Sequence, residues 1–197
     1  VAPAPLATWA INPEAGWNDW ISDMVKMFDM IGHDKIDWIA LHAYSTSPDL
    51  NNFTELKPMD SPFEHRTYSF AVLWEYMQNI PKDMRYKEVH ITETNMNTSW
   101  DKNGGQWVQT LYKTINDWNQ NPDNQKILSA SLFRWNHNDE RWDLSKSETT
   151  KQDFYQALKT GYQHNYELKA PELEIKPKLP RAKRPYVNAE LGLNLRA

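Results

Sequence analysis

"KEVHITETNMNTSW", residues 87–100, starts as a stretch typical of a buried strand and then becomes polar. A carboxylate, Glu93, lies at the changeover between two threonines, and Asn95 follows directly. Residues 87–95 therefore predict a strand that leaves the core and ends on a glutamate. The role of this carboxylate has to be inferred from the rest of the sequence.

Strands and helices are predicted to alternate along the chain. Short, nearly continuous apolar runs indicate buried strands, and apolar residues at helical spacing, ended by Gly or Pro, indicate helices. Strands are expected at 1–9, 35–45, 87–95 and 125–138, and helices at 17–32, 66–81, 104–120 and 149–166. Strands separated by helices are typical of βαβ units with a parallel sheet, so the predicted fold class is α/β.

Composition narrows the function classes. The chain has 197 residues, 40% hydrophobic and 24% charged, which suits a soluble globular domain. A net charge of -4 gives no reason to expect nucleic acid or an anionic membrane as a partner, and no apolar run is long enough to span a bilayer. Without cysteine, thiolate metal sites and Cys nucleophiles are excluded. The six His lack metal-site spacing, and no phosphate loop or G-x-S-x-G elbow is present, so no metal or cofactor is expected.

Polar and aromatic residues gather at the predicted carboxyl ends of the strands, where parallel sheets bind ligands. The chain is also rich in aromatic residues, with ten Trp and nine Tyr. Two interpretations stay open for these rings: ordinary core packing, and stacking on the apolar faces of sugars. The strand-end residues are Trp9, His42, Tyr44, Glu93, Asn95, Trp135, Asn136 and His137.

The C-terminal region differs in character from the rest. Residues 167–185, "ELKAPELEIKPKLPRAKRP", are rich in Pro, Lys and Arg and predict an extended linker. Residues 186–197 become strand-like, and "LGLNLRA" (191–197) resembles the start of a bacterial SH3-like domain. Such modules often bind bacterial cell walls, so a secreted or cell-surface location is expected.

Residues 1–166 resemble the C-terminal half of a clan A glycoside hydrolase, a (β/α)8 TIM-barrel enzyme. "DWIALHAYS" looks like the sixth barrel strand with its H-x-Y pair, and "VHITETN" looks like the seventh, which ends on the nucleophilic glutamate. "ASLFRWNHND" looks like the eighth strand, which brings a Trp to the sugar, and "VAPAPLATW" would be the fifth. The resemblance therefore implies strands five to eight of a barrel and a carbohydrate substrate.

The resemblance also implies a role for each strand-end residue. Glu93 would be the catalytic nucleophile of a retaining hydrolase, and Tyr44 would hold it ionised and oriented. Trp135 would stack on the sugar. The remaining substrate-binding candidates are His42 and Asn95, which would take hydroxyls, together with His137 and Trp9.

One family feature is absent. The clan's acid/base glutamate ends the fourth strand in an Asn-Glu pair, and no such pair occurs in this sequence. The alternatives within the chain are Glu14, Glu64, Asp139 and Glu140. The chain is therefore interpreted as a piece that is inactive alone and whose partner is the missing N-terminal half of the barrel. An open half barrel is expected to expose edge strands and an apolar inner face.

Two other interpretations remain open. The first is a non-catalytic carbohydrate- or cell-wall-binding protein built on a glycosidase-like barrel. An Asn-Glu pair at the end of an upstream strand would favour the enzyme over this binding protein. The second is an unrelated α/β fold, such as a small doubly wound domain complete in itself.

Overall fold

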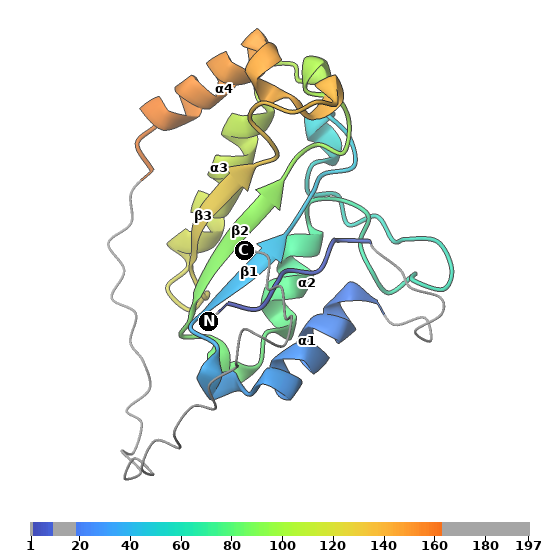
Figure 1. The fold of residues 1–197 in the computed structure, drawn as a ribbon, viewed down its shortest axis with the longest axis vertical. Coiled ribbons are helices and arrows are strands. Elements are labelled where there is room, and N and C mark those ends of the chain that lie inside the picture. The colour runs from blue at the N-terminus through green and yellow to red at the C-terminus, as the bar shows by residue number, and fades with distance from the viewer. Residues whose placement is uncertain (1, 10–18, 163–197) are drawn as a thin grey trace, which may run out of the picture.

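The computed structural model describes residues 2–9 and 19–162 and contains three strands and four α-helices in alternation (Figure 1). This order confirms the α/β prediction. The predicted linker (167–185) and the SH3-like segment (186–197) lie outside the described residues. The elements are α1 (Trp20–Ile31), β1 (Trp38–His42), α2 (Val72–Asn79), β2 (Glu88–Thr94), α3 (Trp107–Gln120), β3 (Ile127–Leu132) and α4 (Glu148–Lys159).

The three strands form one parallel sheet in the order β1-β2-β3. The spatial order is thus the order along the chain. Leu41 of β1 lies opposite Ile91 of β2, and Ile91 lies opposite Ala130 of β3. All three strands consequently bring their carboxyl ends to the same edge of the sheet.

One face of the sheet carries the hydrophobic core. Ile39, Leu41, Val89 and Ile91 alternate along their strands and are buried against helix side chains such as Phe28. In Figure 1, α2 and α3 lie behind the sheet, and α1 crosses below α2. In the described part of the chain, no helix has the length and apolar character needed to cross a membrane.

The opposite face is more polar than expected. Trp38 packs edge-on against His90 with ring centroids 5.0 Å apart, and His90 Nδ1 lies 2.9 Å from Ser129 Oγ. Thr92 and Ser131 on the same face are exposed. The expectation of an apolar inner face is therefore wrong, because alternate positions of β2 and β3 carry hydroxyl and imidazole groups.

The expected strand at residues 1–9 is not formed in the described part, 2–9. Pro3 and Pro5 lack the backbone N–H that a ladder requires, which explains why this segment makes no regular pairing. It still lies beside β1, because the Thr8 hydroxyl donates to the carbonyl of His42 (Figure 1). The segment thus contributes side chains to the carboxyl edge of the sheet without being a strand.

Helix α3 begins on a carboxylate from α4. Its own N-terminal residue Gln106 makes no side-chain cap, and buried Asp153 accepts instead from Val108 N at 2.7 Å and from Gln109 N at 3.2 Å. Asp153 also accepts from Asn103 Nδ2 at 3.1 Å. A carboxylate at this position satisfies free N–H groups and complements the helix dipole, so it joins α3 to α4.

We expect Asp153→Ala to lower the free energy of unfolding by about 2–4 kcal/mol, because it leaves several buried N–H donors unpaired. Urea denaturation followed by circular dichroism measures this. The matched control is Asp117→Ala, which removes an exposed i,i+4 partner of Lys113 and should cost less than about 0.5 kcal/mol. Equal losses in the two variants would contradict this role of Asp153.

Candidate functional site

Backbone pairing continues past the carboxyl ends of the strands. Ala43 N donates to Glu93 O at 3.2 Å, Ser45 N donates to Asn95 O at 3.0 Å, and Phe133 N donates to Thr94 O at 2.9 Å. These hydrogen bonds hold the segments that follow β1, β2 and β3 side by side at the carboxyl edge of the sheet. Side chains that are far apart in the sequence therefore meet above the sheet.

Strand β2 is irregular at Glu93. The pairing with β1 advances from Leu41 opposite Ile91 to His42 opposite Glu93, so two residues of β2 face one of β1. The pairing with β3 also shifts, between Ile91 and Thr94. An extra residue of this kind re-aims a side chain and is common beside functional sites. The extra residue in β2 therefore sets the direction in which the Glu93 side chain points.

The Glu93 carboxylate is held by Tyr44. The Tyr44 hydroxyl donates to Glu93 Oε1, and its oxygen lies 3.2 Å from His42 Nδ1. Burial raises the pKa of Tyr44 above its ordinary value, and the hydrogen bond to Glu93 raises this pKa further. Tyr44 therefore remains a protonated donor to the carboxylate at physiological pH.

His42 completes a chain of hydrogen bonds. Burial lowers the pKa of His42 below its ordinary value, although the nearby Glu93 carboxylate acts in the opposite direction. Neutral imidazole has one N–H, and the Tyr44 proton already goes to Glu93. We therefore assign the His42 proton to Nδ1, which donates to the Tyr44 oxygen.

Glu93 opens into a cavity of about 310 Å³ at the carboxyl edge of the sheet. This volume is at the lower end of the range of small-molecule sites. Aromatic rings form its walls, and the amides of Asn95 and Asn97 and the hydroxyl of Thr8 provide polar groups. Its lining consists of Thr8, Trp9, Tyr44, Glu93, Asn95, Asn97, Phe133 and Trp142.

Two cavity residues have unusual backbone conformations. Trp9 has φ 61° and Asn97 has φ 53°, which places both in the left-handed region. This region is costly for a bulky residue such as Trp, and such residues gather at functional sites. Trp9 is held by its indole N–H, which donates to Thr67 O at 3.2 Å, and by its ring, which lies 4.8 Å from that of Tyr68.

The structure brings together five of the seven candidate site residues. Glu93, Tyr44, Asn95 and Trp9 line the cavity, and His42 contacts Tyr44 behind it.

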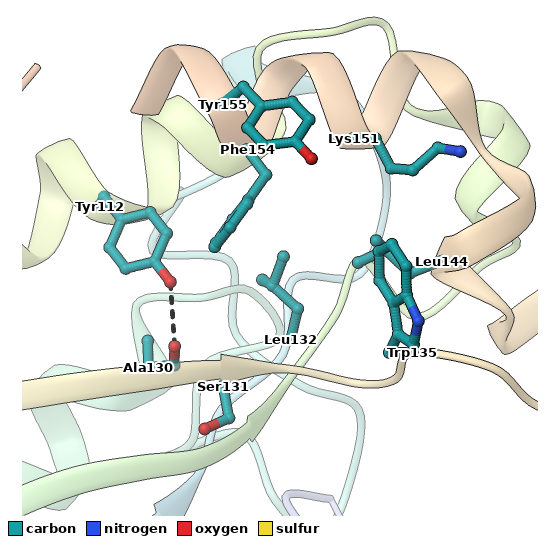
Figure 2. A pocket seen from close by; sticks show the side chains of 9 residues that line it. All are labelled: Tyr112, Ala130, Ser131, Leu132, Trp135, Leu144, Lys151, Phe154 and Tyr155. Atoms are coloured by element: carbon teal, nitrogen blue, oxygen red, sulfur yellow. Dashed lines mark hydrogen bonds between the residues drawn. The ribbon is translucent and has the colours of Figure 1, made fainter. Parts of the chain in front are cut away.

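Trp135 and His137 lie elsewhere. Trp135 lines a separate pocket between β3 and α4 (Figure 2). His137 accepts a hydrogen bond from Asp139 N at 2.9 Å, and its ring lies 6.1 Å from that of the cavity residue Phe133. Trp135 is therefore not a wall of the Glu93 cavity.

Trp142 is the aromatic wall that sequence reasoning missed. The loop after β3 folds back, since Arg134 N donates to Trp142 O at 3.1 Å and Leu144 N donates to Arg134 O at 3.0 Å. This turn brings Trp142 beside Phe133, with ring centroids 6.2 Å apart. No local pattern in the sequence indicates such a return, so sequence alone favours Trp135, which is closer to the strand end.

None of the alternative acid candidates among the described residues lines the Glu93 cavity. A hydrogen bond from Arg141 holds the pKa of Asp139 at about 2, which is unsuited to a general acid. Glu140 bonds Lys146 at 2.7 Å, and Glu64 is exposed. Glu14 lies outside the described residues. Of the described residues around this cavity, Glu93 alone carries a carboxyl group.

Metal chemistry gains no support at this site. Within residues 2–9 and 19–162, no three His, Asp or Glu side chains are grouped so that they could hold an ion.

Comparisons with known proteins do not assign this chain to a family: no family model, curated protein or solved structure matches it. The chemistry of the cavity is therefore argued from its own residues.

We expect Tyr44→Phe and Glu93→Ala to be strongly non-additive, because the hydroxyl and the carboxylate bond each other in a partly buried site. A double-mutant cycle of unfolding free energies measures the coupling, and we expect about 1–3 kcal/mol. The cycle of Tyr44→Phe with Glu88→Ala, at the opposite end of β2, serves as the control and should be additive within about 0.5 kcal/mol. Additivity in both cycles would show that the bond between Tyr44 and Glu93 is not formed in solution.

Proposed function

We propose that this chain is the C-terminal half of a retaining glycoside hydrolase, with Glu93 as the nucleophile. The observation that carries the proposal is the Glu93 carboxylate in an aromatic-walled cavity, bonded by Tyr44 and aimed by the irregularity in β2. Pyranose rings have apolar faces that stack on aromatic walls, and the amides beside the carboxylate are suited to hydroxyl groups. A carbohydrate is thus the substrate class that fits.

The arrangement of the sheet supports a barrel segment over a doubly wound domain. A doubly wound sheet reverses its strand order at a switch point and carries helices on both faces. Here the strand order follows the chain, and within residues 2–9 and 19–162 the helices lie only on the Ile91 side of the sheet. We propose that the three strands are the sixth to eighth of a (β/α)8 barrel.

An all-parallel sheet rarely leaves one face open. The face that carries Trp38 and His90 is uncovered by the described helices. We propose that the missing N-terminal half of the barrel is the partner that encloses it, and that it supplies the acid/base carboxyl group. Secretion or cell-surface display is proposed with this function.

The proposed reaction proceeds by two displacements. Glu93 attacks the anomeric carbon, a bond forms between its carboxylate oxygen and that carbon, and the glycosidic C–O bond breaks as the leaving oxygen takes a proton from the acid of the other half. Water, deprotonated by the same group, then cleaves the glycosyl ester and releases Glu93. Tyr44 would bond Glu93 in its ionised state and release it as the ester forms.

A non-catalytic carbohydrate- or cell-wall-binding protein is the second candidate. The aromatic walls suit a binding protein as well as an enzyme. The absence of a second carboxyl group among the described residues around the cavity favours the binding protein. The candidates differ in one measurable respect: an enzyme needs the charge of Glu93, whereas a binding protein needs only its hydrogen bonds.

We expect Glu93→Gln in the full-length parent to lower turnover by at least about a thousandfold and to leave substrate binding intact. The measurement is hydrolysis of aryl glycosides beside equilibrium binding of the matching oligosaccharide. Glu88→Gln, which alters the opposite end of the same strand, should keep turnover within about threefold. Near-normal turnover in the Glu93→Gln variant would show that Glu93 is not the nucleophile. A parent that binds oligosaccharide but hydrolyses no glycoside would favour the binding protein.

The two tryptophans after β3 should differ in effect. Trp142→Ala removes a wall of the Glu93 cavity, so we expect affinity for oligosaccharides to fall by about tenfold or more, in line with the loss of an aromatic platform. Trp135→Ala alters the separate pocket and should change affinity by less than about threefold. Titration calorimetry of both variants measures this. A larger loss of affinity for Trp135→Ala than for Trp142→Ala would show that Trp135, as the sequence predicts, is the ring that stacks on the sugar.

A further inference from the structure

A second pocket, of about 290 Å³, lies between β3, α3 and α4 and plays no part in the proposed reaction. Figure 2 shows aromatic side chains turned into it from both helices and from the segment after β3. Its floor is fixed by Tyr112, whose hydroxyl donates to Ala130 O at 3.0 Å. Its lining is predominantly apolar: Tyr112, Ala130, Ser131, Leu132, Trp135, Leu144, Lys151, Phe154 and Tyr155.

Exposed apolar side chains extend from this pocket along α4. Phe154 and Ala157 of α4 face the core, whereas Tyr155, Leu158 and Tyr162 are 54%, 59% and 40% exposed. Tyr155 and Leu158 are three residues apart, which places them on one stripe of α4, and Tyr162 follows shortly after the helix ends at Lys159. Helix α4 therefore has a second apolar face that begins at the pocket.

The pocket adjoins a free sheet edge. β3 is the last strand on its side of the sheet, and its outer edge meets no other strand within residues 2–9 and 19–162. Native proteins rarely leave such an edge uncovered. An extended segment fits both features, because its backbone can bond the edge while alternate side chains enter the pocket.

The chain itself contains a segment with this pattern. In "PELEIKPKLP", residues 171–180, the apolar Leu173, Ile175 and Leu179 alternate with Glu and Lys. Strict alternation of this kind suits a strand with one buried side, and Lys and Pro are typical of edge strands. The segment lies outside the described residues.

The connection is long enough for the segment to reach the pocket. Leu173 follows Tyr162 by eleven residues, and an extended chain spans about 3.3 Å per residue, or about 36 Å in total. Helix α4, with 12 residues, is about 18 Å long. The segment can therefore return past the whole of α4 to β3.

We propose that residues 172–180 cover the outer edge of β3 and place Leu173 and Ile175 in the pocket of Tyr112, Trp135 and Phe154. This contact does not rest on the proposed function. A strand of the missing barrel half would need the same edge, so the two contacts exclude each other. The segment covers the edge whenever no such strand is bound.

Cysteine pairs test the contact directly, because the chain has no cysteine of its own. In the full chain, Tyr155→Cys is combined in turn with Leu173→Cys, Ile175→Cys, Lys176→Cys or Lys178→Cys, and oxidation to the intramolecular disulfide is followed by mass. We expect the pairs with Leu173→Cys and Ile175→Cys to close at least about tenfold faster than the other two, since alternate side chains face opposite sides. Met30→Cys with Ile175→Cys gives the background rate, because Met30 is 87% exposed on α1, far from α4 in Figure 1.

Three results would overturn the proposal: equal rates in all pairs, rates at the Met30 background, or disulfide-linked dimers as the main product, which would assign the pocket to a second copy. Hydrogen exchange of β3 amides provides a measurement without engineered thiols. Ile175→Asp should speed exchange at Leu128–Leu132 by about tenfold or more, whereas the adjacent Lys176→Asp should not. Unchanged exchange in Ile175→Asp would also reject the contact.

Discussion

The irregular pairing of β2 with both of its neighbours is the constraint on which the candidate site depends. Up to Ile91 the strand alternates regularly, and its apolar residues face the helices. At Thr92 and Glu93 it gains a residue relative to β1 and shifts against β3. Regular alternation would place position 93 on the helix side, where an ionised carboxylate would be costly. The shift allows one strand to serve a buried core and then present a carboxylate to solvent.

The neighbouring segments depend on the same shift. Since Ala43 N and Ser45 N bond the carbonyls of Glu93 and Asn95, the residues after β1 follow the course of β2. Tyr44 stands between those two bonds, and its hydroxyl meets the Glu93 carboxylate. The hydrogen bonds of the backbone therefore place the donor, and burial keeps its proton in place by raising the pKa of Tyr44.

Much of the fold could be predicted from the sequence because its signals are local. Helical spacing and continuous apolar runs identify three strands and four helices, with ends that differ from the observed ones by up to seven residues. The strand expected at 1–9 failed because an apolar composition cannot replace the N–H groups that Pro3 and Pro5 lack. The polar face of the sheet could not be predicted from the apolar runs, because it depends on alternate positions in β2 and β3.

The candidate site was predictable only in part. Glu93 lies near the end of β2, and Tyr44 and Asn95 follow β1 and β2 within two residues, so parallel pairing brings these three residues to the same edge of the sheet. Trp142 could not be found in this way, because it reaches the cavity through a loop that returns to Arg134. Trp135 follows β3 closely, but its side chain turns toward α4 and lies in the separate pocket. Proximity to a strand end is thus a reliable guide for the first two residues after the strand and a poor one beyond them.

Covalent trapping of a glycosyl group is the most direct test of whether Glu93 is the nucleophile. A 2-deoxy-2-fluoroglycosyl fluoride needs no acid, because fluoride departs as the ester bond forms, and the fluorine at C2 slows hydrolysis of that ester. Gluco-, manno- and xylo-configured reagents would be applied to the full-length parent, followed by peptide mass analysis. We expect a glycosyl group on the peptide that contains Glu93, and none in the Glu93→Gln variant. A label on another carboxylate, or inactivation with Glu93 unmodified, would contradict it.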